Sequence, residues 1–203
     1  MYTPEDFKME DSNEILEFIK SNSFGILVSA QSTFEPLATH LPFYLRQDEP
    51  IVLESHLAKS NAQSEVIKNG KTVLAIFSGP NGYISSSVYG HENVPTWNYQ
   101  SVHLYGTISI LNEEEQEHHL ADLMTNYENN REIKKEFAKL PKSLIEEYKK
   151  EILCFRITVY RMEAAYKLSQ NRNQKDHKAI IEDLEKTQQN DALVTAMKKH
   201  YKK

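Results

Sequence analysis

The segment SHLAKSNAQ, residues 55–63, brings together side chains that could bind an anion. His56, Lys59, Ser60 and Asn61 fall within six residues, after a predicted strand and before a predicted short helix. A cation, a hydroxyl group and the free N–H groups of a helix start provide the charge and the fixed donors that a phosphate monoester needs. The segment therefore predicts a phosphate site, and a capped helix with one exposed lysine is the structural alternative.

The segment VPTWNY surrounds the single tryptophan, Trp97, with polar groups. Pro95 fixes the backbone, while Thr96, Asn98 and Tyr99 add directional hydrogen-bonding partners. An indole in a protein core needs only one partner for its N–H group. The combination therefore favours contact with a planar ligand that is rich in heteroatoms.

Two polar segments could complete such a site. The segment GPNGYISSSVYG, residues 79–90, is typical of a surface loop that is long enough to cover a ligand. The segment KLSQNR directly follows the last predicted strand. Its polar groups suit the carbonyls and ring nitrogens of a heterocycle, and they suit a solvent-exposed loop equally well. They are Lys167, Ser169, Gln170, Asn171 and Arg172.

The sequence motifs of the common enzyme classes are missing. The chain has no Walker A loop and no GxGxxG, HExxH, CxxC or GxSxG motif. His118 and His119 are adjacent, so on a helix they point to different faces and do not chelate one ion. Because they lie in an acidic stretch, both are expected on the solvated surface. The acidic run NEEEQE before them is typical of the first turns of a solvated helix.

The composition is that of a globular protein. A chain of 203 residues suits a single domain, 1–203, and its hydrophobic and charged fractions are 39% and 26%. The net charge of -5 and the pI near 5.9 argue against broad attraction to nucleic acid, and the only basic cluster is the terminal KKHYKK. Cys154 is the one cysteine, no secretory signal is evident, and no apolar run reaches the ~20 residues that span a bilayer. We expect a cytoplasmic protein that does not enter a membrane.

Hydrophobic periodicity predicts a helix followed by several strands. Asp11 can cap a helix over residues 11–21, and Glu14 lies at capping-box spacing. Short segments rich in branched and aromatic residues predict a run of strands, and the stretch 61–70 predicts a short helix closed by Gly70. The predicted strands are 24–30, 36–45, 50–57 and 72–79.

The second half of the chain predicts two more strands and more helices. A period of two indicates half-buried strands at 101–110 and 153–163. Between them a helical stretch runs from about 113 to 150 with a break near Pro141, and two helices close the chain at about 174–186 and 191–200. Six or seven strands without regular strand–helix alternation predict an α+β, mainly β domain. We expect mostly antiparallel strands in a barrel or sandwich with peripheral helices.

A set of short segments, taken in order, resembles a known family. MYTPEDF, THLPF, SHLAKSNAQ, IFSGPNGYIS, VPTWNYQSVHLYG and YKLSQNR resemble the PaiB-like family of FMN-binding negative transcriptional regulators. The resemblance extends from Met1 to about Met197. Because this family is similar in its core to pyridoxamine-phosphate oxidase, the resemblance implies a split β-barrel that dimerises and binds FMN at the subunit interface.

The resemblance also implies which residues bind the cofactor. The segment around Lys59 would hold the FMN phosphate, and the strand around His40 would run beside the isoalloxazine, partly through backbone groups. Trp97 would close over the ring or the dimer interface, and the segment from Lys167 would reach the flavin, including from the partner subunit. The implied cofactor-binding residues are Thr39, His40, Leu41, His56, Lys59, Ser60, Asn61, Trp97, Asn98, Lys167, Ser169, Gln170, Asn171 and Arg172.

Two functions with a bound flavin are compatible with these residues. The resemblance implies a homodimeric negative regulator of transcription, although the acidic chain has no evident helix-turn-helix and its charge does not support direct DNA binding. Regulation through a protein partner or through flavin chemistry stays open. The alternative is a flavin-dependent oxidoreductase of unknown substrate, with His40, Tyr83, His103 and Lys167 as candidates for proton delivery.

Two departures from the family pattern support a third function. Val88 lies in a stretch where the family has a tryptophan, and Lys59 stands where arginine is usual. Lysine supplies charge without the bidentate fork of arginine, so it holds a phosphate less rigidly. A dimeric scaffold without cofactor is therefore the third possibility.

Overall fold

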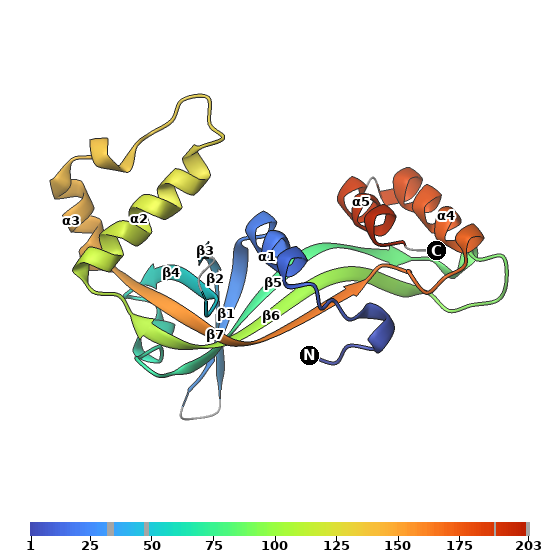
Figure 1. The fold of residues 1–203 in the computed structure, drawn as a ribbon, viewed down its shortest axis with the longest axis horizontal. Helices are drawn as coiled ribbons and strands as arrows, with labels where there is room; N and C mark the ends of the chain where they lie inside the picture. The colour runs from blue at the N-terminus through green and yellow to red at the C-terminus, as the bar shows by residue number, and fades with distance from the viewer. Residues whose placement is uncertain (32–34, 47–48, 189, 202–203) are drawn as a thin grey trace. The chain divides into compact units, whose positions relative to one another are not determined.

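The computed structural model of the protein describes residues 1–31, 35–46, 49–188 and 190–201. Within these residues it contains one seven-stranded sheet in the order β2-β1-β5-β6-β7-β4-β3, together with five α-helices (Figure 1). The strands are β1 (Phe24–Ala30), β2 (Pro36–Pro42), β3 (Tyr44–Arg46), β4 (Val52–Ala58), β5 (Thr72–Ile84), β6 (Thr96–Ile110) and β7 (Ile152–Lys167). The α-helices are α1 (Ser12–Ser21), α2 (Glu113–Glu128), α3 (Lys142–Glu151), α4 (Gln174–Asp183) and α5 (Asp191–His200). The shorter helical turns are the 3-10 turns η1 (Glu5–Phe7), η2 (Ala62–Glu65), η3 (Ser86–Val88) and η4 (Phe137–Lys139) and the π-helical turn η5 (Leu184–Gln188).

The chain groups into two compact units, and the three long strands β5, β6 and β7 contribute residues to both. The first unit contains Met1–Phe18, Ser78–His103 and Glu163–Lys203, and the second contains Ile19–Phe77 and Leu104–Met162. The mainly β composition with helices confirms the predicted α+β class.

The second unit is built from antiparallel strands around an apolar interior. β1 pairs with β2 and β5, and β4 pairs with β3 and β7. The buried side chains of these strands and of β6, together with Phe43 between β2 and β3, form an apolar core, which includes Leu27, Leu53, Phe77, Leu104 and Phe155. α2 and α3 follow one another in the chain and share an apolar groove that includes Leu123 and Ile145.

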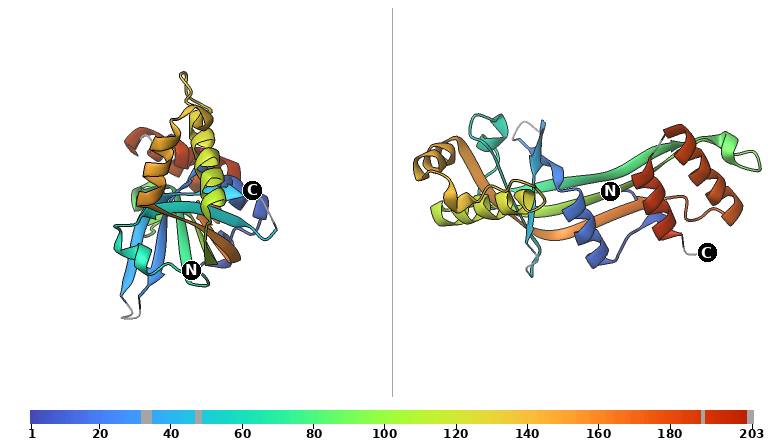
Figure 2. Two further views of the ribbon diagram at one scale, coloured as in Figure 1. Left: turned by 90° about the vertical axis from the view of Figure 1, so that its left-hand side faces the viewer. Right: turned by 90° about the horizontal axis from the view of Figure 1, so that it is seen from above.

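The first unit packs helices on the remaining strand segments. α4 and α5 lie beside the parts of β5 and β6 that belong to this unit (Figure 2), and Asn190 before α5 donates a hydrogen bond of 2.8 Å to the carbonyl of Asn81. The predicted i, i+4 pairs of these helices, Ile180 with Leu184 and Leu193 with Met197, are buried.

Several predicted elements are confirmed. β1 and α5 have the predicted bounds, and Asp11 caps α1 because its Oδ1 accepts a hydrogen bond of 3.1 Å from the Glu14 amide. The acidic run begins α2 as predicted, with a capping box between Asn112 and Glu115. None of the helices in the described ranges combines the length and the apolar character that crossing a bilayer requires.

Other predicted elements are wrong in extent. The strand predicted at 36–45 is two strands, because Pro42 has no amide donor and the Phe43 amide turns to bond the Ser23 carbonyl at 2.8 Å. The helix predicted to end at Gly70 is the short turn η2, and Gly70 instead occupies a separate turn with φ of 77°. The long helical stretch is interrupted from 129 to 141, except for η4.

Candidate functional site

The predicted phosphate segment begins in the last residues of β4, continues beyond that strand and is hydrogen-bonded to β2. The Asn61 Oδ1 accepts a hydrogen bond of 2.9 Å from the Gln63 amide, and its Nδ2 donates to Thr39 Oγ1 at 3.1 Å. The two predicted cofactor-binding segments around Thr39 and Asn61 are therefore in contact. The Asn61 side chain is committed to this bond and to capping η2, so its contribution to a ligand is to shape the segment.

Of the four residues predicted to bind the anion, Lys59 and Ser60 are exposed. The Lys59 ammonium group donates to the Lys150 carbonyl at 2.7 Å, and the Lys59 amide donates to the Glu151 carbonyl at 2.8 Å. The last carbonyls of α3 carry the negative end of the helix dipole, which holds the lysine at this place. Both side chains remain accessible to an anion in solution.

His56, the fourth predicted member, contacts a residue that the sequence analysis placed elsewhere. Its Nδ1 lies 3.1 Å from Nε2 of His119, and the two rings meet edge to face. His119 is 0% exposed, so the prediction of a solvated His118–His119 pair is wrong for His119, while His118 is exposed. The ring is buried because α2 turns this position toward β4, where Glu54 provides a polar partner.

Glu54 is the centre of a buried ionic network. Its Oε1 accepts two hydrogen bonds from Arg156, of 3.0 and 2.7 Å, and its Oε2 lies 2.9 Å from Nε of Arg46 and 3.6 Å from Nδ1 of His119. Burial would raise the pKa of the Glu54 carboxyl, but its polar contacts with His119, Arg46 and Arg156 outweigh burial and lower that pKa to about 2. Glu54 is therefore ionised although it is buried.

Two more carboxylates extend the network from α2. Arg46 donates to Asp122 at 2.6 Å, and Arg156 donates to Glu115 at 3.2 Å. Within the described ranges, no group of three or more histidine, cysteine, aspartate or glutamate residues is arranged to hold a metal ion. The network is therefore best described as ion pairs that fix β3, β4, β7 and α2 together.

The members of this network lie on four different elements, so the sequence does not show which residues pair with Glu54. The signal available was in β4, where Glu54 and His56 alternate with Leu53, Ser55 and Leu57. Two polar side chains on one face of an otherwise apolar strand indicate a polar partner on that face.

The strand predicted beside the isoalloxazine is an outer strand of the sheet. Among the described strands, β2 pairs only with β1, and the carbonyls near its two ends accept side-chain hydrogen bonds, Leu37 from Gln63 at 3.3 Å and Pro42 from Ser55 at 2.7 Å, so the part of the strand between them is the part a ligand could approach. Thr39 is half-buried, Leu41 is buried, and His40 is exposed and stacks on Phe24 with the ring centres 6.0 Å apart. This strand can therefore offer both backbone and side-chain contacts.

In the first unit the structure joins the segments VPTWNY and KLSQNR. Asn98 and Ser169 are buried and form two hydrogen bonds, from Nδ2 to Oγ at 3.0 Å and from Oγ to Oδ1 at 3.1 Å. Ser169 has a φ of 59°, which is uncommon for a residue with a side chain. Lys167 donates to Thr96 Oγ1. The two segments therefore form one polar corner.

Gln170 ties the same corner to the N-terminal segment MYTPEDF. Its Nε2 donates to the carbonyls of Tyr166 at 2.6 Å and Asp6 at 2.9 Å, and its Oε1 accepts from the Leu168 amide at 2.8 Å. The Lys167 ammonium group also lies 5.9 Å from the centre of the Phe7 ring. Gln170, Asn98 and Ser169 are thus occupied by internal bonds and position the corner.

The remaining side chains of the corner are accessible. Asn171 is exposed, and Arg172 is half-buried with its guanidinium 5.0 Å from the Tyr89 ring centre. Burial lowers the pKa of Lys167, and the nearby positive charge of Arg172 lowers it further. Two neighbouring cations favour an anionic or carbonyl-rich ligand.

Trp97 is 53% exposed and lies edge to face with Tyr83, with the ring centres 6.3 Å apart. Both are in strands, because the segment predicted as a loop from residue 79 belongs to β5 as far as Ile84 and becomes a loop only after it. The strand β6 also begins at Thr96, earlier than predicted, which places Asn98 on the buried face and Trp97 on the opposite one.

These donor groups fit FMN. Lys59 and Ser60 can accept a phosphate monoester, because both side chains are exposed on one turn. The open edge of β2 can meet the carbonyl and N–H groups of a flavin ring. The Asn61–Thr39 bond holds these two parts in one unit.

Comparison with known proteins agrees with this description. Residues 1–161 match the family described as "Putative FMN-binding domain". The chain is 42% identical over 186 residues to the Bacillus subtilis (strain 168) protein named "Protease synthase and sporulation protein PAI 2", covering 91% of this chain and 89% of that protein.

Solved structures with low sequence identity share the fold. A FAD and heme binding protein from Mycobacterium smegmatis superposes with a TM-score of 0.62 at 14% identity, over 79% of this chain and 73% of that one. A conserved hypothetical protein from Mycobacterium tuberculosis superposes with a TM-score of 0.61 at 13% identity, over 86% and 95%. The family match over most of the residues, the 42% identical relative and the antiparallel sheet lead to one conclusion: the chain belongs to the PaiB-like family of FMN-binding split-barrel proteins.

Proposed function

We propose that FMN binds with its phosphate at the segment after β4 and its ring along β2. Lys59 and Ser60 hold the phosphate with His56 beside them, and the backbone from Thr39 to Leu41 meets the ring. The observation that carries this proposal is the hydrogen bond of 3.1 Å between Asn61 and Thr39, because it joins the two contact regions.

We also propose that the polar corner of the first unit, formed by the segments VPTWNY and KLSQNR, takes part in flavin binding. Trp97, Lys167, Asn171 and Arg172 contact the flavin, and they do so from the partner subunit of a homodimer. Asn98, Ser169 and Gln170 position these side chains. The exposure of Trp97 supports this role, since an indole that filled a core would be buried.

An apolar face of the second unit supports the homodimer. Phe24 is 65% exposed, and the side chains that share its face of β1, β2 and β5 are only partly covered. The register places Ile26 opposite Ile76 and Val28 opposite Leu74 on this face. A second copy of the chain would remove this apolar surface from water.

We further propose that the FMN-bound dimer acts in the cytoplasm as a negative regulator of transcription. The Bacillus subtilis relative is named "Protease synthase and sporulation protein PAI 2", and this name supports a cellular role of this kind. The net charge of -5 disfavours direct contact with DNA, so the role is exerted through a protein partner or through the flavin. Of the basic terminal cluster, Lys202 and Lys203 lie outside the described residues.

A flavin-dependent oxidoreductase is the second candidate function. The lowered pKa of the Lys167 ammonium group supports it, because an amine that releases its proton more readily can take part in proton transfer near a flavin. Turnover of NAD(P)H with an electron acceptor would favour this candidate, and its absence together with regulation of a target promoter would favour the regulator.

The first experiment is the visible absorbance of the purified protein, as isolated and after addition of FMN and removal of the excess. A retained flavin spectrum with a dimeric mass by light scattering is the expected result. A colourless protein that does not retain FMN would reject the proposed site and leave a dimeric scaffold. A yellow monomer would reject the assignment of the polar corner to a partner subunit.

A further inference from the structure

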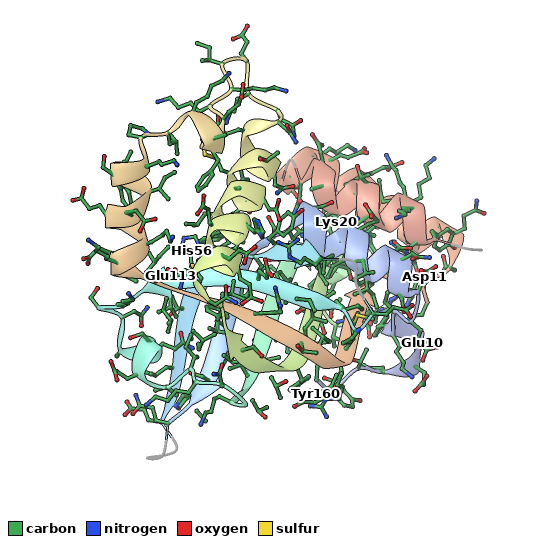
Figure 3. The ribbon with its side chains drawn as sticks, turned by 60° about the vertical axis from the view of Figure 1, so that its left-hand side comes forward. Glu10, Asp11, Lys20, His56, Glu113 and Tyr160 are labelled. Atoms are coloured by element: carbon green, nitrogen blue, oxygen red, sulfur yellow. The ribbon has the colours of Figure 1, made fainter. Side chains whose placement is uncertain are left out.

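The buried histidine pair links the ionic network to the proposed phosphate site. His119 lies between Glu54 and His56, with its Nδ1 3.6 Å from the Glu54 carboxylate and its Nε2 3.1 Å from His56 Nδ1. Glu54 Oε2 and His119 Nδ1 are both buried, and neither makes a hydrogen bond of good geometry among the described residues, although Nε of Arg46 lies 2.9 Å from Glu54 Oε2. His56 lies on β4, three residues before Lys59, and is labelled at the foot of α2 in Figure 3.

The chemistry of the neighbours assigns the proton positions. An ionised carboxylate only accepts hydrogen bonds, so the His119 proton faces Glu54 from Nδ1. His119 Nε2 is then an acceptor, and His56 donates to it from Nδ1. A neutral His56 therefore has no proton on Nε2, the nitrogen that is left for a ligand.

The net charge of the ionic network beside His56 and His119 favours the binding of one additional proton. The network contains three carboxylates and two guanidinium groups, so the charges of these five groups sum to one negative charge. Cys154 lies opposite His56 in the strand register, and burial raises the pKa of its thiol to about 12, so it stays neutral. Of the surrounding groups, Glu54 approaches His119 directly, and Arg46 and Arg156 link Glu54 to Asp122 and Glu115, while Lys59 and Lys149 act on the Cys154 thiol.

We propose that binding of the FMN phosphate places a proton from solvent on His56 Nε2, and that Glu54 acts through His119 to position and stabilise the resulting imidazolium. The inference rests on the proposed location of the phosphate. The proton comes from water or buffer, and no other bond forms or breaks. Without ligand, burial and the neighbouring His119 lower the pKa of His56 to about 4, so the ring is neutral at neutral pH. A phosphate dianion nearby supplies the negative partner that reverses this.

The test is titration calorimetry of the whole protein with FMN in buffers of different ionisation enthalpy, at about pH 7.5, where the phosphate is mostly a dianion. The expected result is an uptake of about 0.5 to 1 proton per FMN. Riboflavin, which lacks the phosphate, is the matched ligand and should bind without uptake. FMN binding whose enthalpy is the same in every buffer, after correction for its own phosphate, would overturn the inference and leave the proposed site intact. Equal uptake with riboflavin would overturn it as well.

Variants separate the roles of the two rings. His56→Gln should bind FMN more weakly and without proton uptake, because an amide donates without titrating. His119→Gln should still bind FMN with reduced uptake, while His118→Gln, at the exposed neighbour, should behave like the wild type. Unchanged uptake in His56→Gln would assign the proton to another group. Failure of the wild type to bind FMN at all would reject the proposed function together with this inference.

Discussion

The Asn98 amide and the Ser169 hydroxyl form two hydrogen bonds to each other, of 3.0 and 3.1 Å, between segments 71 residues apart. Both side chains are buried, and Ser169 has a positive φ. The pair fixes the turn after β7 against the start of β6. The side chains that follow in this turn, Asn171 and Arg172, depend on it for their position.

Removing the Ser169 hydroxyl should destabilise the fold. Ser169→Ala is expected to lower the free energy of unfolding by about 1–3 kcal/mol, because the buried Asn98 amide loses its partner. Ser169→Gly should cost less, by up to about 1 kcal/mol, because glycine accepts a positive φ without strain. Urea denaturation measures both, with Ser109→Ala on the exposed face of β6 as control. Equal losses for alanine and glycine would show that the backbone at this position is not strained.

Trp97 should matter for the flavin and not for folding. Because its side chain is 53% exposed, Trp97→Ala is expected to change the free energy of unfolding of the apoprotein by less than about 0.5 kcal/mol. The dissociation constant of FMN should rise about tenfold, or ~1.4 kcal/mol. Fluorescence titration with FMN measures the second effect, and Tyr160→Ala, at a residue 60% exposed, is the control. A large loss of stability with unchanged FMN affinity would make Trp97 a packing residue.

Lys59 should distinguish FMN from riboflavin. Lys59→Gln is expected to weaken FMN binding at least tenfold, or ~1.4 kcal/mol, and to leave riboflavin binding almost unchanged, because only FMN carries the phosphate charge. Lys59→Arg should bind FMN as tightly as the wild type or more tightly, since a guanidinium can bond two phosphate oxygens. The control is Lys68→Gln at an exposed position. Equal weakening of both ligands would place the phosphate elsewhere.

Acid should destabilise the protein in two steps. The pKa of His56 falls from its ordinary 6.5 to about 4 on folding, so the unfolded chain binds a proton that the folded one does not, and stability is lost as the pH falls from about 6.5 toward 4. Glu54 then contributes between about 4.5 and 2, because folding lowers its pKa from 4.5 to about 2. Each step is on the order of 1–3 kcal/mol.

Chemical denaturation at a series of pH values measures both steps. His56→Gln should flatten the pH dependence above pH 4, while His118→Gln should not alter it. A wild-type protein whose stability is constant from pH 6.5 to 4 would mean that the His56 ring is hydrated in solution.

Local patterns predict those elements whose ends are set by local chemistry. β1 is bounded by polar residues and alternates throughout, and α5 begins at an aspartate after the Asn190 cap, so both were predicted with correct bounds. The strand predicted at 36–45 is divided because Pro42 offers only its carbonyl, which Ser55 bonds at 2.7 Å. Because Ser55 lies in another strand, β4, the sequence around Pro42 does not reveal this contact.

The candidate site was predicted in part for the same reason. Residue types led to the prediction of Lys59 and Trp97 as ligand contacts; both side chains are exposed, and their role stays a prediction. They did not reveal that Asn98 and Asn61 are occupied by internal bonds, or that His119 is buried against Glu54, because each of these depends on a partner far away in the sequence. In β6 the predicted alternation simply continues five residues earlier, to Thr96, and it is this continuation that separates Asn98 from Trp97.

The position of β2 at the outside of the sheet has a consequence for handling the protein. An outer strand with unpaired backbone groups is a template for unwanted pairing with other chains, and this one carries the exposed residues Ala38 and His40 beside Phe24. A flavin along its edge would cover those groups. FMN would then protect the protein from aggregation as well as serve as its cofactor, and preparations stripped of flavin should precipitate sooner than preparations that retain it.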